Sequence, residues 1–123
     1  MIENGLTHTS TLLVTANDTA IALGSGDMPV LATPRMIALM ENAAMLAVAP
    51  SLEEGQTTVG GHIESSHLKP SKVGAEVSAT ATLVKVEGKK LYFYVKATMG
   101  DVTIGEGTHL RFILDGEKFT SKL

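Results

Sequence analysis

The sequence contains no cysteine. This absence excludes disulfides, thiolate zinc sites, iron–sulfur clusters and cysteine nucleophiles. Aromatic residues are also scarce, with 3 Phe, 2 Tyr and no Trp among 123 residues, so a stacking platform for single-stranded nucleic acid is not expected. Lys and Arg total 10 against 13 Asp and Glu, giving a net charge of −3. A protein that neutralises many phosphates carries a basic excess, and we therefore expect no nucleic-acid partner.

Long hydrophobic runs are missing as well. The most apolar stretch, residues 36–49, is too short to span a bilayer and is interrupted by Glu41 and Asn42. The first six residues lack a basic region followed by an apolar run, so no secretory signal is expected. With no internal repeat, linker or charge block, the sequence predicts one domain over residues 1–123, outside the membrane and in the cytoplasm.

What the chain does have is apolar residues, which make up 44% of it. A chain of this length can bury enough of them for one core. Charged residues make up only 19%, which leaves little charged surface for a monomer. We therefore expect part of the apolar surface to be covered by a partner.

The strongest local signal predicts a helix over residues 34–49. Thr33 and Pro34 suit the N-cap and the first helical position, the following residues are mostly Met, Leu, Ile and Ala, and Pro50 ends the pattern. Apolar side chains lie on two opposite sides of this helix. It is therefore expected to be buried on nearly all sides, with one side against a second subunit.

The rest of the chain alternates with the period of a strand. Strands are predicted over residues 7–15, 57–68, 76–86, 91–99 and 102–114, with turns at 17–18, 87–89 and 100–101 and a loop at 24–29. One long helix with an antiparallel meander is typical of an α+β fold. The sheet is expected to curl around the helix, because only the helix can cover its apolar face.

Glu41 stands out within the predicted helix. Its neighbours one turn away, Ile37, Ala38, Ala44 and Met45, offer no cation. A carboxylate in apolar surroundings costs free energy unless it is bonded, and such carboxylates cluster at functional sites. Glu41 is therefore a candidate catalytic group. The alternative is a glutamate at the helix edge that is solvated or bonded to backbone.

Thr33 has a structural explanation as a helix cap, and also a chemical one. It lies two turns before Glu41, beside the free N–H groups of the first helical turn. That end of a helix dipole favours a developing oxyanion or a phosphate.

The histidines do not form a metal site by spacing. His62 and His67 are five residues apart on one predicted strand and should point to opposite faces, so no metal ligation is expected. His67 lies near the strand end, where side chains reach into clefts, whereas His8 and His109 are expected at the surface. The pair Gly60–Gly61 within the same strand indicates a bulge or a close backbone approach by a ligand.

Three segments of the chain resemble a known family. The runs ATPRMIALMENAA (residues 32–44), TVGGHIESSHLKP (58–70) and VGAEV (73–77) are similar to the hot-dog-fold thioesterases related to fluoroacetyl-CoA thioesterase. The resemblance covers residues 28–86, and the remainder agrees in strand pattern. The joint spacing of Thr33, Glu41 and His67 carries it.

The resemblance implies an antiparallel sheet wrapped around one central helix, and a homodimer through the sheet edges that could pair further into a tetramer. It also implies hydrolysis of an acyl-CoA thioester to free acid and CoA, with Thr33, Glu41 and His67 as catalytic residues. Glu41 would attack the thioester carbonyl or activate a water, and His67 would assist proton transfer to the departing thiolate. Coenzyme A would be part of the substrate, and no separate cofactor is implied.

Four further residues are candidates for substrate binding. Gly60 matches a family position whose backbone approaches the thioester, and Gly61 is its neighbour. Lys69 and Lys72, near the strand end, could contact the phosphates of CoA. The chain departs from the family at residues 25–28, which are small, polar or flexible where the fluoroacetate-specific enzyme places an aromatic gate. Fluoroacetyl selectivity is therefore not implied.

Three alternatives stay open at this point. The chain could be a non-catalytic module that binds acyl-CoA or acyl-carrier protein, or a hydratase or dehydratase on the same fold. It could also be a structural dimer in which Glu41 is simply hydrogen-bonded.

Overall fold

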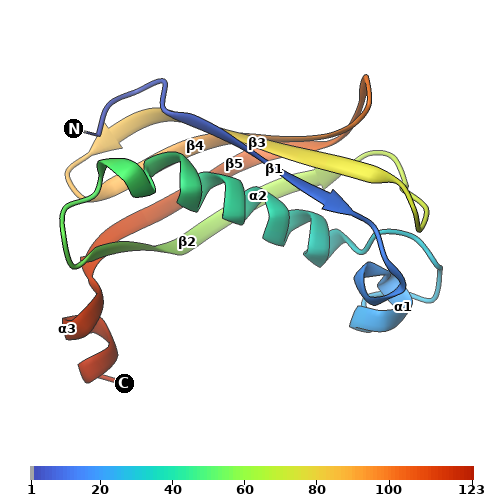
Figure 1. The fold of residues 1–123 in the computed structure, drawn as a ribbon, viewed down its shortest axis with the longest axis horizontal. Coiled ribbons are helices and arrows are strands. Elements are labelled where there is room, and N and C mark those ends of the chain that lie inside the picture. The colour runs from blue at the N-terminus through green and yellow to red at the C-terminus, as the bar shows by residue number, and fades with distance from the viewer. Residues whose placement is uncertain (1) are drawn as a thin grey trace.

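The computed structural model describes residues 2–123. Five antiparallel strands form one sheet in the order β1-β3-β4-β5-β2, and one long helix, α2, crosses it (Figure 1). The strands are β1 (Thr7–Leu13), β2 (Gln56–His67), β3 (Glu76–Glu87), β4 (Lys90–Met99) and β5 (Val102–Asp115). The helices are α1 (Ala20–Leu23), α2 (Thr33–Val48) and α3 (Gly116–Ser121), with 3-10 turns at Ala16–Asp18 and Ala49–Ser51. This α+β arrangement confirms the predicted fold class.

The core lies between α2 and the concave face of the sheet. On β3 and β4 every second residue is buried, as the alternation predicted, and most of the β3 residues are small enough for the helix to approach closely. The fully buried positions are Val77, Ala79, Ala81 and Leu83 on β3 and Leu91, Phe93, Val95 and Ala97 on β4. Met36, Leu39, Met40, Ala43 and Val48 of α2 pack against them.

The helix lies off-centre on the sheet. It packs mainly over β1 and β3 and much less over β2. As a result Ala38, Met45 and Leu46 are exposed, and Ile37 and Glu41 are only half-buried. The expectation that the helix is buried on nearly all sides is therefore wrong for a single chain. The sequence predicted that one of the two apolar sides faces a second subunit, and this open side is available for such a contact.

The start of α2 differs from the prediction in one informative respect. Ala32, not Thr33, is the N-cap, and no side chain caps the helix. Instead a residue outside the helix fixes its first turn: the carboxylate of buried Asp18 accepts a hydrogen bond from Nε of Arg35 at 3.0 Å. The same carboxylate accepts from the backbone N–H and the hydroxyl of Thr15. The hydroxyl of Thr33 is thus left free for another partner.

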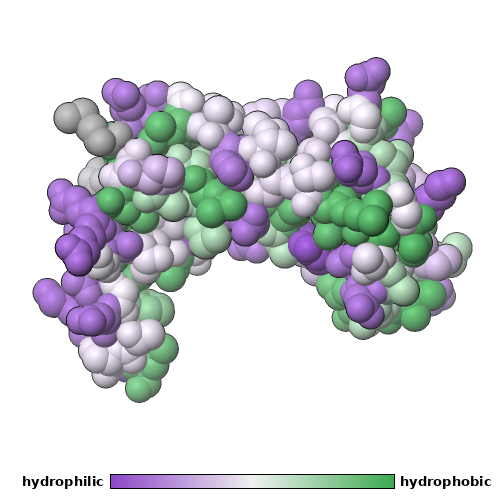
Figure 2. All heavy atoms as spheres, in the orientation of Figure 1, coloured by the Kyte–Doolittle hydropathy of each residue, from purple (hydrophilic) through white to green (hydrophobic). Residues whose placement is uncertain are grey.

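Two short helices were not predicted, and they project from the sheet at opposite ends of the molecule (Figure 1). α1 and the loop after it stand at the end where α2 begins, and α3 stands at the other end. Figure 2 shows a hollow between the two projections, with hydrophobic surface gathered around the α1 end. Exposed apolar side chains there include Ile21, Leu23, Met28 and Leu68.

Strand β2 is a free edge of the sheet with one irregularity. Its pairing with β5 shifts between Gly60 and His62, which confirms the bulge predicted at the glycine pair. A Cβ on Gly61 would lie 2.2 Å from the ring of Phe112, so this position cannot carry a side chain without moving that ring. Within residues 2–123, no helix is long and apolar enough to cross a membrane.

Candidate active site

The first element of the site joins the start of α2 to the end of β2. Oγ1 of Thr33 lies 2.7 Å from Nδ1 of His67. Thr33 is the first residue of α2, and His67 is the last of β2. Two of the three predicted catalytic residues therefore contact each other directly.

His67 is held with its other nitrogen unsatisfied. Its Nε2 is buried and has no hydrogen-bond partner. Burial lowers the pKa of His67, and the backbone of Lys69 opposes this effect more weakly. A neutral histidine with a free, buried nitrogen suits proton transfer to a bound reactant.

A cavity of about 290 Å³ opens beside this pair. Thr33 and His67 form part of its wall, together with Leu68, Lys69 and Pro70 after β2. The remaining wall comes from the α1 region, at Ala20, Ser25, Val30 and Leu31. Lys69, predicted to bind substrate, therefore lies at the cavity, while Lys72 is exposed nearby, in an isolated bridge with Val30.

Glu41 lies elsewhere, in the middle of α2. It is half-buried and faces Gly60 of β2, where an added Cβ would lie 3.3 Å from its Oε2. Across the part of the chain that the structure describes, no Lys, Arg or His nitrogen lies within ion-pair distance of its carboxylate. The prediction that Glu41 has no cationic partner on its own helix is confirmed.

Two further residues converge on Gly60, and the prediction missed both. A Cβ on Gly60 would lie 3.2 Å from Cε1 of His109 and 3.5 Å from Nη1 of Arg111. Both side chains are buried, so the prediction of His109 at the surface is wrong. The physical reason is that His109 lies on the inner face of the sheet, where the ring of Phe93 packs against it. The available signal was the two-residue spacing, which puts both side chains on one face of a strand.

Arg111 is fixed by neighbouring oxygens. Its Nε donates to the hydroxyl of Thr58 at 2.9 Å, and its Nη2 donates to the carbonyl of Thr58 at 3.0 Å. Burial lowers the pKa of Arg111, while the charge of Glu41 opposes this effect. Within residues 2–123 this buried guanidinium makes no ion pair, so it can donate to an anion that reaches it.

The structure does not unite all three predicted catalytic residues within one chain. Thr33 and Glu41 are eight residues apart, which is about 12 Å along a helix. Gly60, beside Glu41, and His67 are seven residues apart, which is about 23 Å along an extended strand. One chain thus presents two half-sites, Thr33–His67 and Glu41–Gly60–Arg111. Over residues 2–123, no group of three or more His, Cys, Asp or Glu side chains is placed to hold a metal ion.

A five-stranded antiparallel sheet curled around one long helix is the hot-dog fold. Among solved structures, a Thermus thermophilus thioesterase superfamily member matches with a TM-score of 0.90 and 30% identity, covering 99% of this chain and 90% of that one. A hot-dog-like protein from Thermanaerovibrio acidaminovorans, 22% identical with a TM-score of 0.87, covering 97% of this chain and 88% of that one, shows the same fold. The chain is thus a hot-dog protein.

Residues 14–117 match the FlK family, described as fluoroacetyl-CoA-specific thioesterase, and the chain belongs to this family. The fluoroacetyl-CoA thioesterase of Streptantibioticus cattleyicolor is 42% identical over 94 residues, which are 76% of this chain and 68% of that protein. The solved structure of the fluoroacetyl-CoA thioesterase FlK matches with a TM-score of 0.92 and 35% identity, covering 99% of this chain and 95% of that one.

Proposed function

We propose that this protein hydrolyses acyl-CoA thioesters to free acid and CoA, with Thr33, Glu41 and His67 as its catalytic residues. Thioester hydrolysis is the activity named for the family to which the chain belongs. The observation that carries the assignment is the 2.7 Å contact between Thr33 and His67 in the wall of a cavity. A histidine held by a hydroxyl at one nitrogen and open at the other is arranged for acid–base chemistry on a ligand.

The reaction divides between the two half-sites. Glu41 attacks the carbonyl carbon or takes a proton from the water that attacks it. The C–S bond then breaks, and His67 assists proton transfer to the departing thiolate: its neutral ring takes a proton from water and passes it to the sulfur, which becomes the thiol of CoA. In the direct route, water then hydrolyses the mixed anhydride between Glu41 and the acyl group. Thr33 orients His67 by accepting from or donating to Nδ1. Hydrolysis in H₂¹⁸O under single-turnover conditions distinguishes the two routes, because only direct attack by Glu41 places ¹⁸O in its side chain.

Arg111 supplies the charge that the reaction requires. Attack on the thioester leaves a negative oxygen, which needs donors that are in place beforehand. Arg111 lies beside Gly60, across from Glu41, so an oxyanion there would meet a fixed guanidinium. Gly60 leaves the room that the reacting carbonyl needs, and a side chain at this position would occupy it.

The separation of the half-sites is the argument for a homodimer. Strand β2 is a free edge of twelve residues, and a long unpaired edge is a template for pairing with another strand. Antiparallel pairing with a second copy, centred between Ile63 and Glu64, would bring His67 of the partner subunit opposite Gly60. Each complete site would then combine Glu41 of one chain with the Thr33–His67 pair of its partner.

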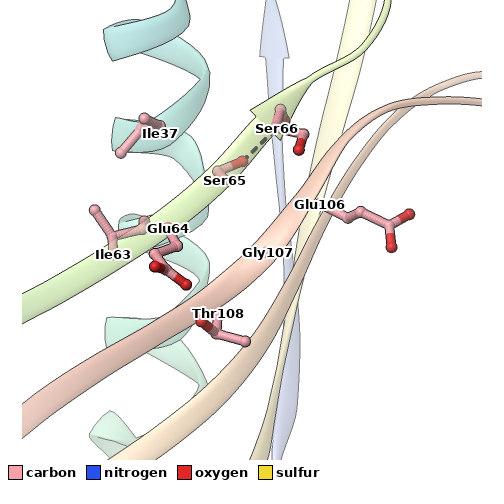
Figure 3. A pocket seen from close by; sticks show the side chains of 8 residues that line it. All are labelled: Ile37, Ile63, Glu64, Ser65, Ser66, Glu106, Gly107 and Thr108. Carbon is pink, nitrogen blue, oxygen red and sulfur yellow. Dashed lines mark hydrogen bonds between the residues drawn. The ribbon is translucent and has the colours of Figure 1, made fainter.

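A hollow lies along the second half of this edge, next to the proposed centre of pairing. It has a volume of about 570 Å³ and is bounded by residues 63–66 of β2, Ile37 of α2 and residues 106–108 of β5. Figure 3 shows these β2 residues in succession, with Ile37 on one side of the strand and Glu106 on the other. Half-buried Ile37 and Ile63 would be covered by a second copy that pairs here.

Mixing two inactive variants tests the composite site. Glu41→Gln and His67→Asn chains would be unfolded together, refolded and assayed for thiol release from acetyl-CoA. In a composite dimer each mixed pair keeps one intact site, so about one quarter of wild-type activity should return. If the complete site lies within one chain, no activity returns. Each variant refolded alone is the control.

The binding of the substrate's phosphates follows from the same assignment. Lys69, at the cavity, and exposed Lys72 are placed to meet the CoA phosphates at the protein surface. Replacing both with Met should raise KM for acetyl-CoA while leaving kcat close to wild type. Pairing of dimers into a tetramer and location in the cytoplasm stay predictions.

A further inference from the structure

His109 and Arg111 form a buried pair that the catalytic scheme uses only in part. The two residues are two positions apart on β5, so their side chains lie on the same, inner face of the strand. His109 is only 2% exposed. A titratable ring this deep in the protein needs its polar atoms satisfied. The identity of its partners therefore determines which protonation state the fold accepts.

The hydrogen bonds define that state. Nη1 of Arg111 lies 3.2 Å from Nε2 of His109, and a guanidinium can only donate. Nε2 of His109 must therefore accept, which means that it carries no proton. The remaining nitrogen, Nδ1, lies 2.7 Å from the carbonyl of His62, which can only accept. His109 is thus the neutral tautomer with its proton on Nδ1.

The surroundings of the ring maintain this state. Burial is the main cause that lowers the pKa of His109, and the charge of Arg111 on β5 lowers it further. His62 on β2 acts in the same direction more weakly, whereas Glu41 on α2 and the His62 carbonyl oppose the shift. The ring of Phe93 on β4 packs at a centroid distance of 6.2 Å and adds no charge.

We propose that His109 is a positioning residue, which, by accepting a hydrogen bond from Arg111, aims the guanidinium at the space beside Gly60 that Glu41 also faces. The inference rests on the proposed thioesterase function and deepens it. Arg111 has five N–H groups, of which Thr58 engages two and His109 a third. The two that remain are free for the oxyanion of the reacting thioester.

Protonation of His109 would undo this arrangement. The ring would lose its only acceptor for Arg111 and would place a second positive charge beside the guanidinium. Activity should therefore fall at acidic pH through two protonations, one at His67 and one at His109. In the wild type the acid limb of log kcat/KM against pH should approach a slope of two.

Two substitutions of His109 distinguish the effect of the hydrogen-bond acceptor for Arg111 from the effect of a ring that can titrate. His109→Gln keeps an acceptor near the Nε2 position and cannot titrate in this range, whereas His109→Leu removes the acceptor. We expect His109→Leu to lower kcat for acetyl-CoA about 100-fold at pH 7.5, with KM changed much less, because misplacing one group by about 1 Å has this order of effect. His109→Gln should keep kcat within about fivefold, and its acid limb should have a slope of one.

Three outcomes would overturn the proposal. They are wild-type kcat in His109→Leu, equal losses in the Leu and Gln variants, and an unchanged acid limb in His109→Gln. The Gln variant decides alone if the Leu variant does not fold. A readout that needs no turnover is the ¹⁵N spectrum of His109, which should show the proton on Nδ1 at pH 7.5. A proton on Nε2 refutes the proposal. The spectrum could show the proton on Nδ1 while the protein releases no CoA from acyl-CoA. This result would refute the thioesterase function and the role of Arg111 in binding an oxyanion, but not the hydrogen bond between Arg111 and His109.

Discussion

The hydroxyl of Thr33 and Nδ1 of His67 lie 2.7 Å apart, across the junction between the start of α2 and the end of β2. Because the hydroxyl is not used to cap the helix, its loss should affect chemistry more than folding. Thr33→Val preserves the shape of the side chain and removes the hydrogen bond, and we expect kcat to fall by about 100-fold. Thr33→Ser keeps the hydroxyl and should stay within a few-fold of wild type. Thiol release from acetyl-CoA measures both, and equal rates in Thr33→Val and wild type would remove the hydroxyl from the mechanism.

The carboxylate of Glu41 should be indispensable for turnover and dispensable for folding. It is half-buried on the open side of α2 and, among residues 2–123, has no ion-pair partner to lose. We expect Glu41→Gln to lower kcat by at least about 100-fold, with an unchanged thermal unfolding midpoint. Glu76→Gln, at an exposed position at the start of β3, is the matched control. Normal turnover in Glu41→Gln would contradict the assignment.

Two glycines should separate activity from stability. A Cβ on Gly60 would lie 3.2–3.5 Å from His109, Glu41 and Arg111, so Gly60→Ala should fold and lose about 10- to 100-fold in kcat because the group fills the reacting space. A Cβ on Gly107 would lie 1.7 Å from the carbonyl oxygen of Glu64. Gly107→Ala should therefore force β2 away from β5 and lower the free energy of unfolding by about 1–3 kcal/mol or more.

Circular dichroism on heating and thiol release would be measured on both glycine variants. The result that would count against this division is a Gly60→Ala protein as unstable as Gly107→Ala, or one that turns over acetyl-CoA at the wild-type rate.

Stability should fall in two separate steps as the solution becomes acidic. The pKa values of His67 and His109 are lowered below the ordinary 6.5, chiefly by burial, so the unfolded chain binds these protons first. The free energy of unfolding should then decline as the pH drops through about 6.5. The pKa of Asp18 is lowered from 3.8, chiefly by the hydrogen bond from the Thr15 backbone. The stability that it contributes is present above 3.8 and is lost only as the pH falls below that value.

Urea unfolding between pH 7.5 and 5.5 measures the first step. His67→Gln and His109→Gln should each flatten the pH dependence, whereas His8→Gln, at an exposed position, should leave it as in the wild type. A free energy of unfolding that is constant over this range would show that neither ring is held neutral by the fold.

The long elements were accessible from the sequence, whereas the catalytic roles of Thr33, Glu41 and His67 stay predictions. Alternation on β3 and β4 and the apolar helix are strong periodic signals, and the glycine pair indicated its bulge. Three features were not accessible. The helices α1 and α3 have only four and six residues and therefore show little periodicity. The off-centre position of α2 was missed because periodicity identifies the apolar face of a helix but not the element that this face contacts, and the burial of His109 was missed because histidines are often found at the surface. The hydrogen bonds of His109 with Arg111 and His62 depend on tertiary packing, which the sequence alone does not give.

The free edge at β2 has a consequence for how the protein behaves at low abundance. If each working site is shared between two chains, dilution below the dissociation constant removes activity and stability together, because assembly stabilises the folded state by mass action. Specific activity would then rise with concentration, and the cell could reduce hydrolysis more than proportionally by making less of the chain.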